Sequence, residues 1–311
     1  MTVILRDYRP RTDDAESVLH LRRLLLPFNL STAEAVENGV TDAHQDSHYR
    51  LTLAEDGAGG RVVGVLRAGI DHQAKQPGQG FAVVLVHPAH LGQGIGAALL
   101  RAAEEQTARA GARALRVWAL DERGRSFAEK RGWEPTGHAL HYLGLDLTTA
   151  TLPDAPPLPA GFELRDTSFL GDDPRALFDA DAEVVLDEPG SVGWVLDDYA
   201  DWLAHDWNDP LHDRGLSSVA VAPDGRIAAF TTAQSDGEDR YRSGMTGVRR
   251  DFRGLGLAKA VKSHSLRKAR ATGHRLAVTS NDDTNGPMRA VNTWLGYAHG
   301  TTEVEYVRPL G

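Results

Sequence analysis

The stretch that decides the fold is Met-Thr-Gly-Val-Arg-Arg-Asp-Phe-Arg-Gly-Leu-Gly-Leu-Ala at residues 245–258, which continues directly into a basic segment ending at Arg270. It predicts a strand, a tight turn that contains glycine, and a helix of about four to five turns. No proline interrupts the segment after Gly254. Apolar residues recur there at helical spacing, at Leu257, Ala258, Val261 and Leu266.

The glycine turn is a candidate site for a phosphate or a pyrophosphate. Gly254 and Gly256 allow a ligand to approach the backbone closely, and the first amides of a helix have no partner inside it. These N–H groups and the positive end of the helix dipole favour a bound anion. Arg253 adds a planar positive group beside them. The alternative is an ordinary strand-to-helix turn of an α/β domain.

Two motifs in this half of the chain carry a family resemblance. Arg253-x-x-Gly256-x-Ala258 matches the Arg/Gln-x-x-Gly-x-Gly/Ala signature of the Gcn5-related N-acetyltransferases (GNAT), which hold the pyrophosphate of acetyl-coenzyme A in such a turn. An apolar strand, Leu276–Ser280, follows about one helix length later. The next segment resembles the second coenzyme A segment of the family, with Asn281, Asn285, Met288 and Asn292 before Leu295-Gly296-Tyr297. Two signatures in the correct order are more specific than either alone.

Length and composition indicate a globular protein of two domains. The chain has 311 residues, which suits two domains of about 150 residues each. Its net charge of −9 argues against a non-specific nucleic-acid binder and suits a cationic small substrate. The absence of cysteine excludes disulfides and a cysteine nucleophile. No apolar run approaches the roughly 18 residues of a membrane span, and the first residues lack a signal-peptide pattern, so we expect a cytoplasmic protein without a membrane partner.

The glycine turn occurs twice in the chain. Residues 87–97, His-Pro-Ala-His-Leu-Gly-Gln-Gly-Ile-Gly-Ala, follow an apolar strand about 160 residues before the second copy. A proline-rich segment at 148–160 lies between the copies and is the predicted linker. We therefore predict an α/β fold with a mixed (α+β) sheet, built from two tandem GNAT acyltransferase domains at 1–147 and 161–311. This architecture resembles that of the mycothiol synthases.

The same order of elements is expected in each copy. It is strand, two helices, hairpin, strand, glycine turn, helix, strand, helix and strand, which is the order of the GNAT family. In the first copy the two helices are expected up to about Leu26 and near Thr32–Val40. In the second copy they are expected at Pro174–Val185 and Val195–Trp207.

The two copies differ at positions that the family uses for binding and catalysis. The Arg or Gln of the signature is Leu91 in the first copy, and leucine cannot pair with a phosphate. The helix position that often carries a tyrosine in the family is Ala128. We therefore expect the first domain to be degenerate, either a structural copy or a weak coenzyme A binder. The second domain is expected to be catalytic.

Basic residues are concentrated around the second glycine turn. Between Arg240 and Arg275 there are eleven lysines and arginines and a single acid, Asp251. The turn favours a phosphate-binding role for Arg253 and its neighbours. The remaining basic residues of the helix suit a solvated helix face, namely Arg267, Lys268 and Arg270.

The resemblance implies an acetyl-coenzyme A site in the second domain. The residues assigned to it are Thr246, Val248, Arg253, Gly254, Leu255, Gly256, Leu257, Ala258, Asn281, Asn285 and Asn292. A backbone N–H near Val248 would polarise the thioester carbonyl. Asn292 stands where the family commonly has a tyrosine acid, so we assign it to positioning the pantetheine arm or the sulfur. No histidine pair shows a reliable metal-ligand spacing, and no metal is expected.

The sequence leaves the general base open. A carboxylate is expected to help deprotonate the acceptor ammonium, and Glu183 and Glu303 are assigned as the catalytic candidates. Further acids near the acceptor pocket or on the closing strands are Asp181, Asp187, Glu188 and Glu305. Tyr241, Tyr297 and Tyr306 are possible acids, although Tyr297 occupies a core position of the family.

These residues predict an acyl-coenzyme A-dependent N-acyltransferase. It would move an acetyl group from acetyl-coenzyme A, its co-substrate, to a primary amine of a small molecule, directly and within a ternary complex, because no cysteine can carry the acyl group. The acceptor stays open between a specialised metabolite such as an aminoglycoside, an amino acid and a polyamine, and the assembly between a monomer and a homodimer. Two alternatives remain: an amide-forming transferase that uses aminoacyl-tRNA, and a non-catalytic acyl-coenzyme A-binding or scaffold protein.

Overall fold

The computed structural model describes residues 3–57, 60–190 and 192–311. The chain divides into two compact units. The first contains the residues up to Ala139 together with Thr302–Gly311. The second contains Leu140–Thr301.

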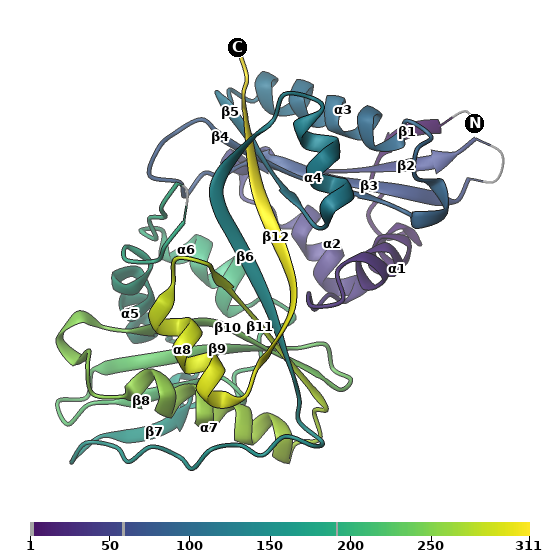
Figure 1. Ribbon diagram of the computed structural model, residues 1–311. Coiled ribbons are helices and arrows are strands. Elements are labelled where there is room, and N and C mark those ends of the chain that lie inside the picture. The colour runs from purple at the N-terminus through teal and green to yellow at the C-terminus, as the bar shows by residue number, and fades with distance from the viewer. Residues whose placement is uncertain (1–2, 58–59, 191) are drawn as a thin grey trace. The chain divides into compact units, whose positions relative to one another are not determined.

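The first unit is a mixed sheet with helices on both faces (Figure 1). Its strands, in the order of the sheet, are β1 (Val3–Asp7), β2 (Arg50–Asp56), β3 (Val62–Ile70), β4 (Gln79–Val86), β5 (Ala114–Ala119), the second part of β12 (Ala298–Pro309) and the first part of β6 (Glu134–Asp146). Its helices are α1 (Asp14–Leu25), α2 (Ala33–Thr41), α3 (Ile95–Arg109) and α4 (Glu122–Glu129). β4 and β5 are parallel neighbours, and the pairs β1–β2, β2–β3, β3–β4 and β5–β12 are antiparallel.

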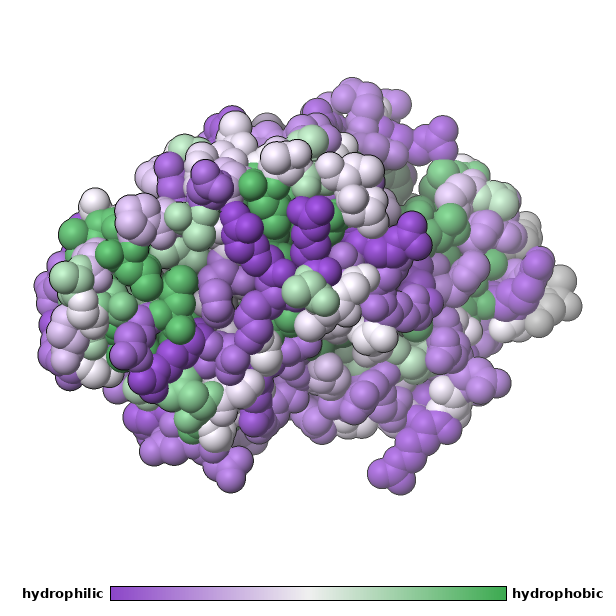
Figure 2. Space-filling model, turned by 90° about the horizontal axis from the view of Figure 1, so that it is seen from below, coloured by the Kyte–Doolittle hydropathy of each residue, from purple (hydrophilic) through white to green (hydrophobic). Residues whose placement is uncertain are grey.

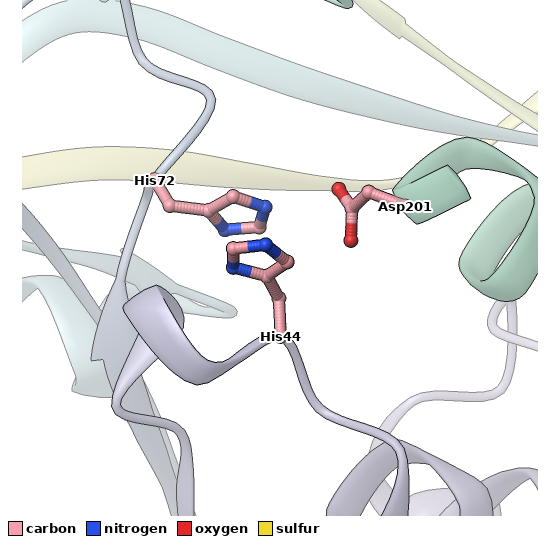
Figure 3. Close-up of side chains that lie close together, drawn as sticks. All are labelled: His44, His72 and Asp201. Atoms are coloured by element: carbon pink, nitrogen blue, oxygen red, sulfur yellow. The ribbon is translucent and has the colours of Figure 1, made fainter. Parts of the chain in front are cut away.

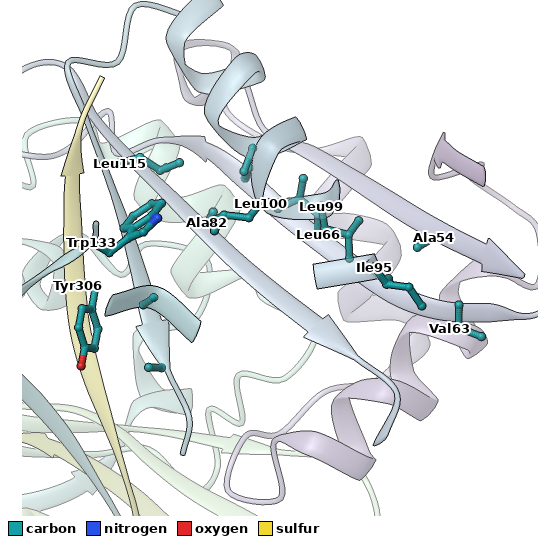
Figure 4. Packing of buried hydrophobic residues seen from close by; sticks show 14 residues of the cluster. Ala54, Val63, Leu66, Ala82, Ile95, Leu99, Leu100, Leu115, Trp133 and Tyr306 are labelled. Atoms are coloured by element: carbon teal, nitrogen blue, oxygen red, sulfur yellow. The ribbon is translucent and has the colours of Figure 1, made fainter. Parts of the chain in front are cut away.

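Two cores cover the two faces of this sheet. On one face Leu99 of α3 packs with Leu66 of β3 (Figure 4). On the opposite face Val18 of α1 packs with Val65 of β3. Val65 and Leu66 point in opposite directions because successive side chains of a strand alternate between its faces.

The second unit repeats this arrangement. Its strands are β7 (Glu163–Asp166), β8 (Ser218–Val221), β9 (Ile227–Ser235), β10 (Arg240–Val248), β11 (Leu276–Asp282) and the second part of β6 (Glu134–Asp146). Its helices are α5 (Arg175–Val185), α6 (Tyr199–Trp202), α7 (Leu257–Ala271) and α8 (Gly286–Leu295). On one face α7 packs through Val261 against Ala229 of β9, and on the other α5 packs through Val184 against Phe230.

The parallel strands β10 and β11 separate soon after they pair. Their pairing covers only Arg240–Arg242 and Leu276–Val278. β10 nevertheless continues to Val248 and β11 to Asp282. A register shift between β9 and β10 begins where this pairing ends, between Ser243 and Thr246 on β10. The facing edges of the two strands are therefore open beyond that point.

The last strand of each half of the sequence closes the sheet of the other unit. β6 pairs with β11 through Leu140–Asp146, which belong to the second unit. β12 pairs with β5 through Val304–Pro309, which belong to the first unit. The predicted domain limits at 147 and 161 rest on the sequence repeat and stay a prediction.

Most of the expected elements are present at the expected places. The predicted order of elements is confirmed in both halves, as is the α/β class with a mixed sheet. The expected helix Val195–Trp207 starts later than predicted, at Tyr199, and is irregular from Leu203 onward. Asp198 accounts for the later start, because its side chain accepts the N–H groups of Ala200 and Asp201 and so caps the helix there.

Within the described residues, none of the helices has the length and the apolar character needed to cross a membrane. The face of the molecule in Figure 2 carries mostly hydrophilic residues, with hydrophobic patches between them.

The packing of α5 on β10 predicts that Gly247 tolerates no side chain. A Cβ atom added there would lie 2.4 Å from Cγ1 of Val184. Gly247→Ala should lower the free energy of unfolding by about 1–3 kcal/mol, the usual cost of overpacking. Urea unfolding followed by circular dichroism measures this. Gly286→Ala is the matched control, because a Cβ at Gly286 meets nothing within 4 Å; equal stability of the two variants would contradict the prediction.

Candidate functional site

The glycine turn of the second unit has the geometry of an anion site. After β10 comes a single 3₁₀ turn, Arg250–Phe252, and then Gly254 and Gly256 with φ angles of 81° and 77°. These left-handed angles favour glycine. A Cβ at either position would meet nothing within 4 Å, so space is open beside both. Gly256 directly precedes α7, whose first amides therefore lie next to this space.

Arginines around the turn pair with two carboxylates at the end of α5. Arg249 Nε donates to Glu183 Oε2 at 2.7 Å. Arg250 donates through Nε and Nη2 to both oxygens of Asp187, at 2.9 and 2.7 Å. Arg253 Nη2 donates to the same carboxylate at 2.7 Å. A diphosphate that binds Arg253 through this nitrogen therefore has to replace Asp187.

These ion pairs decide the acidity of the two carboxylates. Desolvation raises the pKa of Glu183, but the N–H of Arg250 and the guanidinium of Arg249 outweigh it, and the net pKa is lowered. Hydrogen bonds from Arg250 and Arg253 hold the pKa of Asp187 well below its usual range. A carboxylate with a low pKa accepts a proton from an ammonium poorly. Glu183 and Asp187 are therefore better placed to orient these arginines than to accept a proton.

The open edge of β10 presents the backbone of Val248. The N–H of Arg249 donates to Ala228 of β9 at 2.9 Å. Because neighbouring residues of a strand direct their N–H groups to opposite sides, Val248 directs its own N–H toward the β11 side. The carbonyl of Val248 accepts from Arg253 Nε at 3.2 Å. On the same strand Thr246 Oγ1 lies 2.8 Å from Oγ1 of Thr231, so that side chain is held against β9.

The predicted asparagines are packed together at the end of β11. Asn292 is completely buried, and its Nδ2 donates to Asn281 Oδ1 at 2.6 Å. Asn281 is 6 % exposed. Asn292 Oδ1 is buried without a partner among the described residues. Asn285 Oδ1 accepts from the N–H of Met288 at 3.2 Å and caps α8. Asn292 can therefore act on a ligand by holding Asn281, and the side chain of Asn285 is used as a helix cap.

Several acids of the second unit raise one another's pKa values. Desolvation raises the pKa of Asp181 to about 6, although the indole N–H of Trp202 donates to its Oδ2 at 3.0 Å. Desolvation and the charges of Asp181 and Asp282 raise the pKa of Glu188 to about 7. Glu188 is exposed, so a ligand can reach it. Desolvation and the charge of Asp181 likewise raise the pKa of Asp206 to about 7. We call Asp181, Glu188, Asp206 and Asp282 the acidic group.

The sequence is similar to known acetyltransferases over most of its length. The profile of the family described as "Acetyltransferase (GNAT) family" matches twice, over residues 15–133 and 179–297. The chain belongs to the GNAT family.

Named relatives and solved structures agree with this assignment. A mycothiol acetyltransferase of Kineococcus radiotolerans is 34% identical over 292 residues, which cover 89% of this chain and 90% of the relative. A mycothiol acetyltransferase of Nocardiopsis dassonvillei is 30% identical and 96% of each chain is covered. A tandem GNAT protein from the clavulanic acid biosynthesis pathway has a TM-score of 0.76 at 22% identity, with 100% of this chain and 99% of that one covered.

This membership confirms the predicted class of enzyme. The chain is an acetyl-coenzyme A-dependent N-acetyltransferase with two tandem GNAT domains. The comparisons favour neither the tRNA-dependent alternative nor the non-catalytic one.

The first GNAT copy keeps the backbone of the turn but not its charge. Gly92 and Gly94 have φ angles of 77° and 85°, and a Cβ at either would meet nothing within 4 Å. Leu91 stands in place of Arg253 and is 39% exposed. Ala128, at the position of the family's tyrosine, is buried. The two turns therefore differ in side-chain chemistry.

The remaining catalytic candidates lie in packed surroundings. Tyr241 is completely buried, and its hydroxyl lies 2.7 Å from Oγ of Ser265. Tyr297 is also buried, and desolvation raises its pKa well above the ordinary value. Tyr306 donates to Glu129 at 2.7 Å in the first unit. These three tyrosines are therefore packing residues of the cores.

Glu303 and Glu305 belong to the part of β12 that lies in the first unit. Both are buried. Glu305 accepts from Arg116 Nη1 at 3.0 Å and from Thr136 Oγ1 at 2.8 Å. The residues assigned to the acetyl-coenzyme A site, by contrast, belong to the second unit.

Basic residues along α7 have several different roles. Arg270 donates to the carbonyl of Ala150 at 3.0 Å, and Arg267 donates to that of Pro153. Both therefore hold the proline-rich segment, a role that the sequence did not reveal. Lys262 is 2% exposed, and desolvation lowers its pKa to about 7. The basic run is therefore only partly available to a ligand.

Two histidines of the first unit stack face to face. The ring centroids of His44 and His72 are 4.3 Å apart, with an angle of 5° between the rings (Figure 3). Ring nitrogens bind metals in the plane of the ring, so parallel rings do not direct their lone pairs to one point. Asp201, also drawn there, belongs to the second unit and pairs with His205 Nδ1 at 2.8 Å. The expectation that no metal is bound stays a prediction.

The geometry of the turn predicts the loss of acetyl-coenzyme A binding in a double variant, Arg253→Ala with Gly256→Asp. The variant lacks the guanidinium and places a carboxylate at a left-handed position beside the helix amides. Affinity should fall at least about 100-fold, because each hydrogen bond to a charged group contributes about 1.5–3 kcal/mol and 1.4 kcal/mol is tenfold. Calorimetry measures the affinity. Gly94→Asp in the first turn is the matched control, and unchanged affinity in the double variant would refute the placement.

Proposed function

We propose that the second unit carries out the acetyl transfer, and that Val248, Asn281, Asn292 and the turn around Arg253 bind acetyl-coenzyme A. The observation that carries this proposal is the open edge between β10 and β11 next to a turn that keeps its arginine. The first turn has Leu91 instead. The pantetheine arm would lie along the open edge, with the diphosphate at the turn.

We propose that the N–H of Val248 binds the thioester oxygen. When the acceptor nitrogen attacks the thioester carbon, negative charge develops on that oxygen, and a fixed N–H stabilises it. A C–N bond forms and the C–S bond of the thioester breaks. The acceptor ammonium loses one proton before the attack and a second one after it. One of these reaches the departing thiolate, and the other leaves through the base.

Glu188 is the base that we propose, in preference to Glu183 and Glu303. A carboxylate with a pKa near 7 is a stronger base than one with an ordinary or lowered pKa, and it is still ionised in half of the molecules at that pH. The acidic group around it favours an ammonium over a neutral or anionic acceptor. The negative charge of the acidic group also agrees with the net charge of −9 of the chain.

The acceptor that we propose is the amine whose acetylation forms mycothiol. The support is that relatives covered over about nine-tenths of their length carry the name mycothiol acetyltransferase. The test is thiol release from acetyl-coenzyme A in the presence of des-acetyl mycothiol, compared with an amino acid, a polyamine and an aminoglycoside.

Des-acetyl mycothiol should have the highest kcat/KM in this panel. Preference for another amine would refute the acceptor but not the acetyltransfer. Binding of acetyl-coenzyme A without release for any amine would instead refute turnover and favour a sensor.

The raised pKa of Glu188 predicts the pH dependence of the reaction. Glu188 accepts a proton only when it is ionised, so kcat/KM should rise with pH through about 7 and its slope should then decrease. Glu188→Gln should lower kcat about 10²–10⁴-fold and remove the step in the pH profile, which is this rise of kcat/KM near pH 7. Initial rates from pH 5.5 to about 8.5 measure the profile.

Two variants serve as controls for this profile. Glu183→Gln should keep the step near pH 7, because Glu183 has a lowered pKa and stays ionised there. Asp206→Asn should raise KM for the amine and also keep the step. A profile that loses its step in Glu183→Gln and keeps it in Glu188→Gln would assign the base to Glu183 instead.

A further inference from the structure

Arg22, in the last turn of α1, is a desolvated cation of the first unit. Its Nη1 donates to Oγ of Ser31 at 3.1 Å, and Ser31 is 6 % exposed. Desolvation and the charge of Arg67 lower the pKa of Arg22, and the hydroxyl of Tyr49 offsets only part of this. A guanidinium keeps its proton in proteins, so Arg22 remains charged in surroundings that disfavour the charge.

Arg67 approaches this position from β3. It lies two residues after Val65, which packs beneath α1, and alternate residues of a strand share a face. Its guanidinium carbon is 5.4 Å from the centre of the Phe81 ring. The Phe81 ring is in turn 6.5 Å from that of Tyr49. Arg67 is exposed, so a ligand from solvent can reach this side of the group.

Acids on the neighbouring elements do not neutralise the two arginines. Glu37 of α2 accepts from the hydroxyl of Tyr8 and from the N–H of Arg11, the latter at 2.9 Å. In residues 3–57, 60–190 and 192–311, no carboxylate forms an ion pair with Arg22 or Arg67. Two like charges that lack a counter-ion repel each other, and burial strengthens that repulsion. A bound anion would remove this cost.

The corresponding face of the second unit has the opposite charge. On β3, Arg67 lies three residues after Gly64, and Gly64 pairs with Val86, which is six residues before Gly92. In the second unit, Val248 is likewise six residues before Gly254 and pairs with Ala229. The residue equivalent to Arg67 is therefore Thr232, three residues after Ala229. That unit carries the acidic group instead. The two copies therefore carry different charged groups on equivalent faces.

We propose that Arg22 and Arg67, together with Ser31 and Tyr49, form an oxyanion site in the first unit that binds the carboxylate or phosphate of a small molecule. Two guanidinium groups can donate several charge-assisted hydrogen bonds to such a group, and the hydroxyls of Ser31 and Tyr49 can complete its coordination. This site lies on the α1 face, and it does not depend on which unit transfers the acetyl group.

The test is thermal unfolding and calorimetry of the full chain with inorganic phosphate and, separately, succinate, both at constant ionic strength. At least one of the two anions should raise the melting temperature and bind. The one with the larger effect identifies the source of the oxyanion as a phosphate or a carboxylate. Arg22→Gln and Arg67→Gln should each weaken this binding at least 10-fold, and without the anion neither should be less stable than the parent chain.

Two controls separate this site from the glycine turns and from general charge effects. Arg23→Gln removes the same charge from the same helix and should leave anion binding unchanged. The double variant Arg253→Ala with Gly256→Asp removes the anion site at the second-unit turn, and the anion binding that depends on Arg22 and Arg67 should remain in it. The proposal is overturned if neither anion binds, if binding survives in Arg22→Gln and Arg67→Gln, or if it disappears in the second-unit variant.

Discussion

The early separation of β10 from β11 is the constraint on which the second unit depends. A fully paired sheet would use the N–H groups of β10 in hydrogen bonds to β11, and none would be available to a substrate. Here the ladder stops after Arg242 and Val278, and Thr279 Oγ1 donates to the carbonyl of Ser243 at 3.1 Å where the strands part. The turn at Gly254 and the asparagines at the end of β11 then lie on either side of the opening.

The two halves show how one backbone plan can carry different chemistry. Both have two left-handed glycines before a long helix and a helix pair on the opposite face. The second copy has Arg253 at the turn and acids on the opposite face. The first copy has Leu91 at the turn and the arginines Arg22 and Arg67 on the equivalent face. Backbone geometry survives such changes because it depends on glycine positions and apolar spacing, whereas the ligand depends on a few exposed side chains.

The closing strands tie each unit to the other half of the sequence. Leu145 and Leu147, at the end of the first copy, pack in the core that holds Tyr241 and Leu295. Tyr306, at the end of the second copy, packs with the core of the first unit. Neither half of the sequence therefore contains all the residues of its own core. We infer that the two halves fold with mutual dependence, unlike two domains joined only by a linker.

The sequence by itself determined the family, the repeat and the order of elements. These follow from local properties: apolar spacing, glycine and proline positions, and two motifs whose residues are close together in the chain. It also indicated the residues of the turn, because Arg253, Gly254 and Gly256 are neighbours in sequence as well as in space. The proline-rich segment was visible too, but not the basic side chains that hold it.

Only the tertiary structure decided which charges meet. The sequence made Glu183 a candidate base, but the fold brings it to Arg249, and the lowered pKa of Glu183 depends in part on that contact. Asp206 gave no signal in the sequence, because local sequence does not show that Asp181 of another helix acts on it. Arg22 and Arg67, for which the described residues contain no carboxylate ion pair, come together through the packing of α1 on β3. Electrostatic energies depend on distances between such remote residues, and local sequence patterns do not contain those distances.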